Sequence, residues 1–85
     1  GCLLPSLTAE VARAEPAARA ACQSSLQRIH AIVEGWTGSS DKAWTLIAQN
    51  VGAVMLARAM CDEGEQRELL ESVRREGQAL LEGNR

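Results

Sequence analysis

The sequence contains no phenylalanine and no tyrosine, and its only aromatic side chains are those of Trp36 and Trp44. Hydrophobic residues still make up 46% of the 85 residues, so any core consists of Leu, Val, Ile, Ala and Met. Alternating runs of β-branched residues, which are typical of strands, are missing too. Ala, Leu, Glu, Arg and Gln are abundant and favour helix. These features predict an all-α chain with one domain over residues 1–85.

A basic surface is also missing, because 9 Lys and Arg residues stand against 11 Asp and Glu residues, for a formal net charge of −2. The densest basic pair, Arg74 and Arg75, lies between Glu71 and Glu76, a pattern typical of a solvated helix face. Direct binding of DNA or RNA by this chain is not expected, since phosphate binding requires a basic face. The first residues carry no basic segment ahead of an apolar one, as a signal peptide would, so a cytoplasmic location is expected.

Cysteine and histidine are too scarce and too scattered for the common metal and redox motifs. Cys2, Cys22 and Cys61 form no CxxC pair, and we expect them to be small buried hydrophobes in a reducing cytosol. His30, the only histidine, shares a helix face with Glu34, but no third ligand for a metal is indicated. A boundary histidine beside a carboxylate is the simpler interpretation. No GxSxG motif or phosphate loop occurs, so neither an enzyme nor a cofactor is predicted.

Apolar periodicity, with proline, glycine and serine as breaks, predicts four helices. They span about residues 3–14, 16–36, 40–61 and 63–82. Ser39 or Ser40 is a suitable N-cap for the third helix, and Asp62 with Glu65 has the spacing of a capping box for the fourth. Loops this short favour antiparallel neighbours, so we expect the last two helices to form a hairpin within an antiparallel bundle of about four helices.

Residues 43–60, AWTLIAQNVGAVMLARAM, are apolar around nearly the whole circumference of a helix. A membrane span would need about 20 apolar residues, and Gln49, Asn50 and Arg58 are costly in lipid, so no membrane is expected. The pattern instead predicts burial against the home domain on one side and a partner on the other. One line along this helix holds mostly small residues, which allow a close helix crossing. It consists of Ala48, Gly52, Met55 and Ala59.

The apolar stripe of the fourth helix is interrupted by Gly77. A glycine inside a helix costs about 1 kcal/mol relative to alanine, and close packing there would offset this cost. Contacts within the hairpin explain part of the pattern. Two hairpins from two chains, packed as a four-helix bundle about a two-fold axis, explain the apolar surface all round the third helix. The residues predicted for this dimer interface are Ala48, Gly52, Met55, Ala59, Leu70, Val73, Gly77 and Leu80.

The order and spacing of several short motifs resemble those of a known family. The motifs lie in GCLLPSLTAEVARAEPAARAA at residues 1–21 and in AWTLIAQNVGAVMLARAMCD at residues 43–62. They are Gly1-Cys2, then Ala9-Glu10 and Arg13 ahead of Glu15-Pro16, and Gly52 followed by Leu56-Ala57-Arg58-Ala59. Together they resemble the C-terminal regulatory domain of TetR/AcrR-family transcriptional repressors, and the resemblance covers essentially all 85 residues.

The resemblance implies an all-α homodimer in which the C-terminal domain binds a small, often hydrophobic effector and dimerises through its last two helices. In that family an N-terminal helix-turn-helix domain binds DNA, and effector binding changes the separation of the two DNA-reading heads. This chain departs from the family because the helix-turn-helix and the helices that follow it are absent. DNA binding is therefore expected only through an N-terminal domain that these residues do not contain.

An effector pocket between the first three helices is a further implication of the resemblance. Alternatively, the apolar residues predicted for this pocket belong to an ordinary core, and its histidine, His30, lies at the surface. A free-standing helical module that binds a partner helix is the alternative function. The residues expected to line the pocket are Leu7, Val11, Leu26, His30, Val33 and Trp44.

Overall fold

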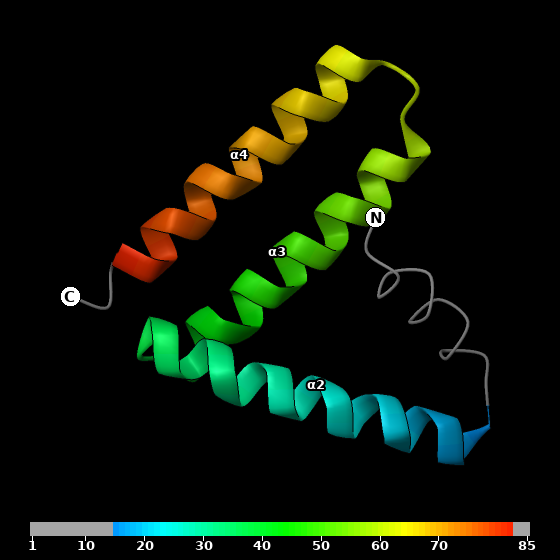
Figure 1. Ribbon diagram of the computed structural model, residues 1–85, viewed down its shortest axis with the longest axis vertical. Coiled ribbons are helices and arrows are strands. Elements are labelled where there is room, and N and C mark those ends of the chain that lie inside the picture. The colour runs from blue at the N-terminus through cyan, green and yellow to red at the C-terminus, as the bar shows by residue number, and fades with distance from the viewer. Residues whose placement is uncertain (1–14, 83–85) are drawn as a thin grey trace.

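The computed structural model describes residues 15–82, which form three α-helices joined by two short loops (Figure 1). The helices are α2, Pro16–Thr37; α3, Ser40–Ala59; and α4, Glu63–Glu82. No strand occurs among these residues, which confirms the all-α prediction. The predicted first helix, residues 3–14, lies outside the described residues, so the four-helix count stays a prediction.

The two ends of α2 are set by a proline and a glycine. Pro16 is in the first turn, where a missing amide hydrogen costs nothing, and Glu15 before it is extended. The helix ends at Thr37, one residue later than predicted. Gly38 then takes a left-handed conformation, with φ 76° and ψ 9°, and its N–H donates to the carbonyl oxygen of Glu34 at 2.8 Å. Residues with a Cβ rarely adopt this conformation, so Gly38 ends the helix.

The loop between α2 and α3 is held by hydrogen bonds around Ser39. The Thr37 hydroxyl donates to the Ser39 carbonyl oxygen at 2.9 Å and accepts from the Ser39 N–H at 3.3 Å. The Ser39 hydroxyl accepts from the N–H of Lys42 at 3.3 Å, so Ser39 is the N-cap of α3. Because Thr37 is also buried, these bonds fix the direction in which α3 leaves α2.

The third helix ends at Ala59, two residues earlier than predicted, because Met60 is extended with φ −97° and ψ 145°. The carboxylate of Asp62 then accepts from the N–H of Glu65 at 2.8 Å, the bond that the capping-box spacing predicts. With so short a loop, α4 returns antiparallel to α3 and lies beside it (Figure 1).

Gln66 joins the end of α3 to the start of α4. Its side-chain N–H group donates to the carbonyl oxygens of Ala57 and Met60, each at 2.8 Å. Carbonyl oxygens in the last turn of a helix have no partner within that helix, so an external donor stabilises the end. One half-buried side chain of α4 therefore bonds to the last turn of α3 and to Met60 just beyond it, and helps to hold the hairpin closed.

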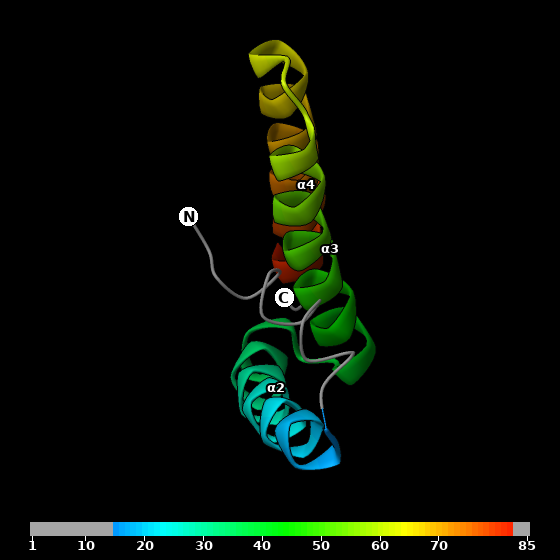
Figure 2. The ribbon, with the colours of Figure 1, turned by 90° about the vertical axis from the view of Figure 1, so that its right-hand side faces the viewer.

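The helices α3 and α4 form one layer, and α2 crosses a single face of it, near the start of α3 (Figures 1 and 2). In Figure 2 the hairpin is seen edge-on, and α2 lies to one side. We call the face that carries α2 the front and the opposite face the rear. No other described helix covers the rear.

The core of the described residues is small. Its buried apolar side chains are those of Val33, Ala43 and Ala53. Gly77 of α4 is buried so close to α3 that a Cβ atom there would lie 3.0 Å from Cδ1 of Leu46. Many large apolar side chains stay exposed, and contiguous exposed apolar surface marks interaction sites. These side chains belong to Ile29, Ile32, Trp36, Trp44, Met55, Leu56, Leu70 and Leu81.

The prediction of buried cysteines is wrong for Cys61, whose free thiol is exposed. The reason is that α3 ends before Cys61 and leaves it in the loop. Cys22 is also free and only half-buried, because it lies in the first half of α2, where that helix diverges from α3 (Figure 1). Cys2 lies outside the described residues.

Candidate functional site

Two grooves lie on opposite sides of α3. The front groove, between α2 and α3, has a volume of about 410 Å³, and the rear groove, between α3 and α4, about 270 Å³. Since a helix turns by about 100° per residue, the α3 residues of the two grooves point in nearly opposite directions. The front groove is lined by Ile29, Val33, Trp36, Leu46, Ile47, Asn50, Val51 and Val54. The rear groove is lined by Ala48, Gln49, Gly52, Ala53, Leu56, Leu69, Ser72, Val73 and Glu76.

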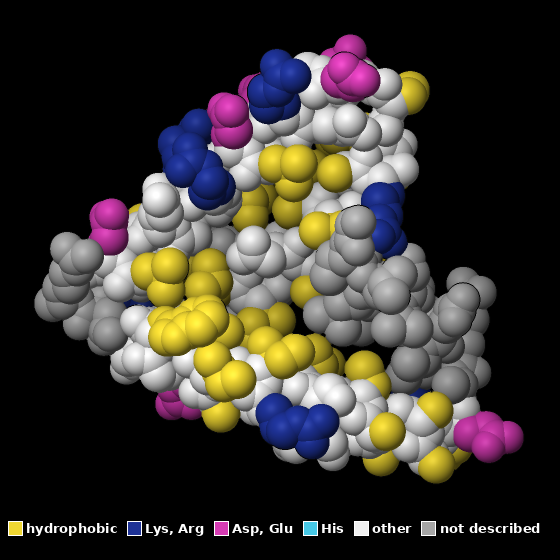
Figure 3. Space-filling model, viewed as in Figure 1, with side chains coloured by type: hydrophobic (Ala, Val, Ile, Leu, Met, Phe, Trp, Pro, Cys, Tyr) yellow, Lys and Arg dark blue, Asp and Glu magenta, His cyan; other side chains and the backbone are white. Residues whose placement is uncertain are grey.

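The front groove is apolar apart from one amide. Figure 3 shows hydrophobic side chains gathered on this face, where α2 crosses the hairpin. Trp36 is 59% exposed and offers a flat aromatic surface. The side-chain NH2 group of Asn50 donates one hydrogen bond to the carbonyl oxygen of Leu46 at 2.8 Å, which leaves its second N–H and its carbonyl oxygen for other partners. The groove therefore combines a large apolar wall with one polar amide.

The residues predicted to line an effector pocket are only partly collected in this groove. Val33 lines the front groove and is buried. Leu26 is half-buried on α2 and lies outside the lining. Leu7 and Val11 lie outside the described residues. The two remaining residues, His30 and Trp44, meet at the start of α3 and do not line the groove either.

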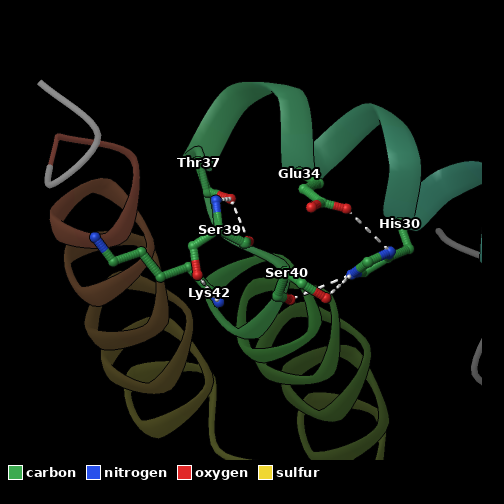
Figure 4. A network of polar contacts seen from close by, with 6 residues as sticks. All are labelled: His30, Glu34, Thr37, Ser39, Ser40 and Lys42. Atoms are coloured by element: carbon green, nitrogen blue, oxygen red, sulfur yellow. Dashed lines mark hydrogen bonds and ion pairs between the residues drawn. The ribbon is translucent and has the colours of Figure 1, made fainter.

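His30 links α2 to the first turn of α3 (Figure 4). Its ring stacks on the ring of Trp44, with centroids 4.0 Å apart and an interplanar angle of 18°. Its Nε2 lies 3.2 Å from the carbonyl oxygen and 3.2 Å from the hydroxyl of Ser40, and its Nδ1 lies 3.8 Å from Oε1 of Glu34. The expected proximity to Glu34 is present. The side chain is only 14% exposed, however, so His30 is an interhelical contact rather than a solvated surface group.

The rear groove contains three residues of the predicted dimer interface, namely Ala48, Gly52 and Val73. A Cβ atom on Gly52 would have no neighbour within 4 Å. The described contacts therefore give no reason for a glycine at this position. The side-chain carbonyl oxygen of Gln49 is buried without a hydrogen-bond partner among the described residues. The rear groove is thus a shallow surface with small residues along α3 and a mixed rim from α4.

The other predicted interface residues are distributed differently. Met55 and Ala59 are exposed on α3, Leu70 is exposed on α4, and Leu80 is half-buried there. Gly77 is buried against α3 of its own chain. The close approach expected at Gly77 is therefore made within the hairpin, and of the two glycines predicted for the interface Gly52 is the one whose Cβ site is open.

The sequence-based prediction missed most of the residues that form the front groove. Ile47, Val51 and Val54 follow the spacing i, i+4, i+7 and form a stripe that could have been found in the sequence. The sequence shows α3 to be apolar all round, however, and does not reveal which stripe faces α2. Ile29 and Trp36 of α2 complete the groove from the other side.

Two other types of site are absent from residues 15–82. No helix between residues 15 and 82 has the length and apolar character needed to cross a membrane. No group of three or more His, Cys, Asp and Glu side chains in the described part is placed to hold a metal ion. Comparison with protein-family models, curated proteins and solved structures finds no match for this chain. The two apolar grooves are the candidate functional sites of the described residues.

Proposed function

We propose that this chain is the dimerisation and effector-binding part of a TetR-like transcriptional repressor that acts in the cytoplasm. In this proposal the α3–α4 hairpin packs against the same hairpin of a second copy, and the front groove takes a small hydrophobic effector. DNA is bound only by an N-terminal domain outside these residues, in keeping with the net charge of −2. The resemblance of the sequence to that family and the surfaces of α3 support the proposal.

The observation that carries the proposal is the uncovered line of Ala48, Gly52, Met55 and Ala59 on α3. Gly52 is half-buried and the other three are exposed, Met55 to 46%. The site of a Cβ atom on Gly52 is empty to 4 Å, although glycine costs about 1 kcal/mol relative to alanine in a helix. A helix from a second copy, packed along this line, would account for the exposed apolar residues and for the glycine.

The dimensions of the hairpin suit such an interface. The helices α3 and α4 have 20 residues each, and a helix of that length spans about 30 Å. Two helices side by side offer room for about 800 Å² per partner, the usual size of a specific interface. A two-fold axis would oppose the same line on each copy and close a four-helix bundle without leaving an unpaired hairpin.

The two grooves would be connected through α3. An effector in the front groove would contact α2 and α3 together, while the second copy would contact the rear of α3. A shift of α2 against a dimerised α3 would then move the N-terminal side of one copy relative to the other. This is the type of movement that the family resemblance implies for release of an operator.

A second candidate function is a helical interaction module that binds a partner helix in the front groove. It is favoured by the 59% exposure of Trp36, which lines that groove. Tryptophan is enriched among the residues that dominate interface energies. A module of this kind would be monomeric until its partner is added, whereas the dimerisation proposal requires self-association.

Sedimentation velocity with a pair of glycine variants tests the proposal. We expect a dimer at tens of micromolar chain. Gly52→Leu should weaken dimerisation about 5- to 150-fold, because overpacking a close helix contact costs roughly 1–3 kcal/mol. Gly35→Leu is the matched control: Gly35 is exposed in α2, and a Cβ atom there also meets nothing within 4 Å. Both changes raise helix propensity equally, so only the position differs.

The possible results separate the two candidates. A monomeric wild-type chain at tens of micromolar contradicts dimerisation and favours the helix-binding module. A Gly52→Leu variant that dimerises as strongly as Gly35→Leu shows that the interface lies elsewhere. Far-UV circular dichroism of each variant establishes that the helices are retained.

A further inference from the structure

We propose that Ser40, His30 and Glu34 form a hydrolytic site at the junction of α2 and α3, and that this site cleaves carboxylic esters of aromatic alcohols. The three side chains stand in the order nucleophile, base and orienting carboxylate (Figure 4). None of them lines the front groove or the rear groove, so the inference goes beyond the proposed function and does not depend on it.

The Ser40 hydroxyl is the nucleophile of this site. Its oxygen lies 3.2 Å from Nε2 of His30, within the distance over which a base takes a proton directly. Ser40 is exposed among the described residues, so an ester can approach the hydroxyl. The N-cap of α3 is the neighbouring Ser39, whose hydroxyl accepts from the N–H of Lys42. A reaction at Ser40 therefore leaves the cap of the helix intact.

The role of His30 depends on which ring nitrogen carries the proton. Nε2 acts as a base only in the tautomer with the proton on Nδ1. The Glu34 carboxylate lies 3.8 Å from Nδ1 and favours that tautomer, whereas the Ser40 carbonyl oxygen, 3.2 Å from Nε2, favours the other. A carboxylate is the stronger acceptor because it is charged, and bonds between catalytic groups are often long before substrate binds. Glu34 is therefore the positioning residue for the base.

Trp44 restricts the orientation of the base and offers a surface for the substrate. The two rings stack with centroids 4.0 Å apart, and the side chain of His30 is only 14% exposed, so the imidazole is held in place. Trp44 itself is 44% exposed. Because aromatic rings stack on one another, an ester whose alcohol part is aromatic is favoured beside this side chain.

The start of α3 supplies hydrogen-bond donors for the oxygen that becomes negative during the attack. The first N–H groups of a helix have no carbonyl partner within that helix. The N–H of Lys42 is bonded to the hydroxyl of Ser39, which leaves the N–H groups of Ser40 and Asp41. Backbone donors of this kind stabilise the oxyanion in acyl transfer, and the N-terminus of a helix favours negative charge.

The reaction has two halves. The Oγ atom of Ser40 bonds to the carbonyl carbon of the ester while its proton passes to Nε2 of His30. When the bond to the aromatic alcohol breaks, Nε2 returns the proton to the departing oxygen, and the acyl group stays on Ser40. Water then attacks the acyl carbon and gives one proton to Nε2. The bond to Oγ breaks as Nε2 protonates Oγ, which releases the carboxylic acid and restores the hydroxyl.

Hydrolysis of p-nitrophenyl acetate by the full chain tests the activity. In Ser40→Ala and in His30→Gln, kcat/KM should fall about 100-fold or more, because general acid–base catalysis contributes about 10²–10⁴-fold. Ser24→Ala, at an exposed serine of α2, is the control and should hydrolyse the ester as the wild type does. Far-UV circular dichroism establishes that each variant keeps its helices. Unchanged hydrolysis in Ser40→Ala would overturn the proposal.

Labelling with a fluorophosphonate locates the nucleophile. The hydroxyl oxygen of an activated serine bonds to phosphorus and displaces fluoride, so the adduct marks the residue that attacks. We expect one adduct per chain, which peptide mass spectrometry places at Ser40, and no adduct at that speed in His30→Gln. Labelling of Ser40 that is no faster than labelling of Ser24 would overturn the assignment of the nucleophile.

The role of Glu34 has a spectroscopic readout that a merely structural contact would not change. His30 is the only histidine, so nitrogen NMR of the chain labelled in histidine reports this ring without overlap. We expect the neutral ring to carry its proton on Nδ1 in the wild type and on Nε2 in Glu34→Gln. The labelling rate of Ser40 should fall at least about tenfold in the same variant. The same tautomer and the same rate in both proteins would overturn the role of Glu34.

Discussion

The contact between Gly77 and Leu46 gives a prediction that the structure makes quantitative. A Cβ atom at Gly77 would lie 3.0 Å from Cδ1 of Leu46, whereas carbon atoms in optimal contact are about 3.5–4.0 Å apart. In Gly77→Ala the Leu46 methyl group must therefore retreat by roughly 0.5–1 Å. Leu46 also lines the front groove, so its methyl group has open space to move into. The smaller substitution is thus expected to be tolerated, and a larger one is not.

The magnitudes follow from two opposing effects. Replacing glycine within a helix gains about 1 kcal/mol of propensity. In Gly77→Ala the small overlap offsets most of this gain, and we expect stability within about 0.5 kcal/mol of the wild type. In Gly77→Leu three further carbon atoms enter the space between α3 and α4, and overpacking costs about 1–3 kcal/mol. The net expectation for Gly77→Leu is a loss of about 0–2 kcal/mol.

Urea unfolding followed by far-UV circular dichroism measures these differences at one fixed chain concentration, since self-association would shift the apparent stability. Gly35→Ala and Gly35→Leu are the matched controls, and each should gain about 1 kcal/mol because its Cβ atom meets open space. Adding Leu46→Ala should partly rescue Gly77→Leu, with a coupling of about 1 kcal/mol. If Gly77→Leu is as stable as Gly35→Leu, or if the double variant is additive, α4 does not pack on α3 at this point.

Two further predictions concern hydrogen bonds at the helix junctions and use the same unfolding measurement. Gln66→Leu removes both bonds to the end of α3 and should cost about 1–2 kcal/mol, whereas Gln78→Leu, on an exposed position of α4, should change stability by less than about 0.5 kcal/mol. Thr37→Val keeps the shape of a side chain that is 1% exposed but removes its two bonds to Ser39, so a loss of about 1–2 kcal/mol is expected. Thr45→Val, at an exposed position, is its control, and an equal loss in the two threonine variants would refute the role assigned to the buried hydroxyl.

The helices of the described chain were predictable because their ends depend on neighbouring residues. Pro16 starts α2, Gly38 stops it, and Ser39 and Asp62 cap the helices that follow. Each of these effects acts over at most four residues, so a linear sequence contains the information. The one clear error of length is at the end of α3. The helix stops before Met60, which is extended, although no proline or glycine lies at that position.

The candidate sites were less predictable. Val33, one of the residues predicted for an effector pocket, lines the front groove, but Ile47 and Val51 of α3, which line it too, were not among the predicted residues. The sequence showed that this helix is apolar around nearly its whole circumference, and so did not indicate which side of it faces α2. His30 was paired with Glu34, which lies on the same helix, yet its stack on Trp44 joins two helices and has no periodic signature.

The sequence by itself determined the all-α character of the described residues, the caps of the helices and the excess of apolar surface on α3. These properties follow from local propensities and from composition. The tertiary structure decided which side of α3 faces α2, that Gly77 packs within its own chain, and that Gly52 does not. The packing of α4 on α3 governs the two glycine outcomes, and the direction in which α2 crosses the hairpin governs the first outcome. That direction is set by a two-residue loop and a few interhelical contacts, which depend on distance in space and not on spacing along the chain.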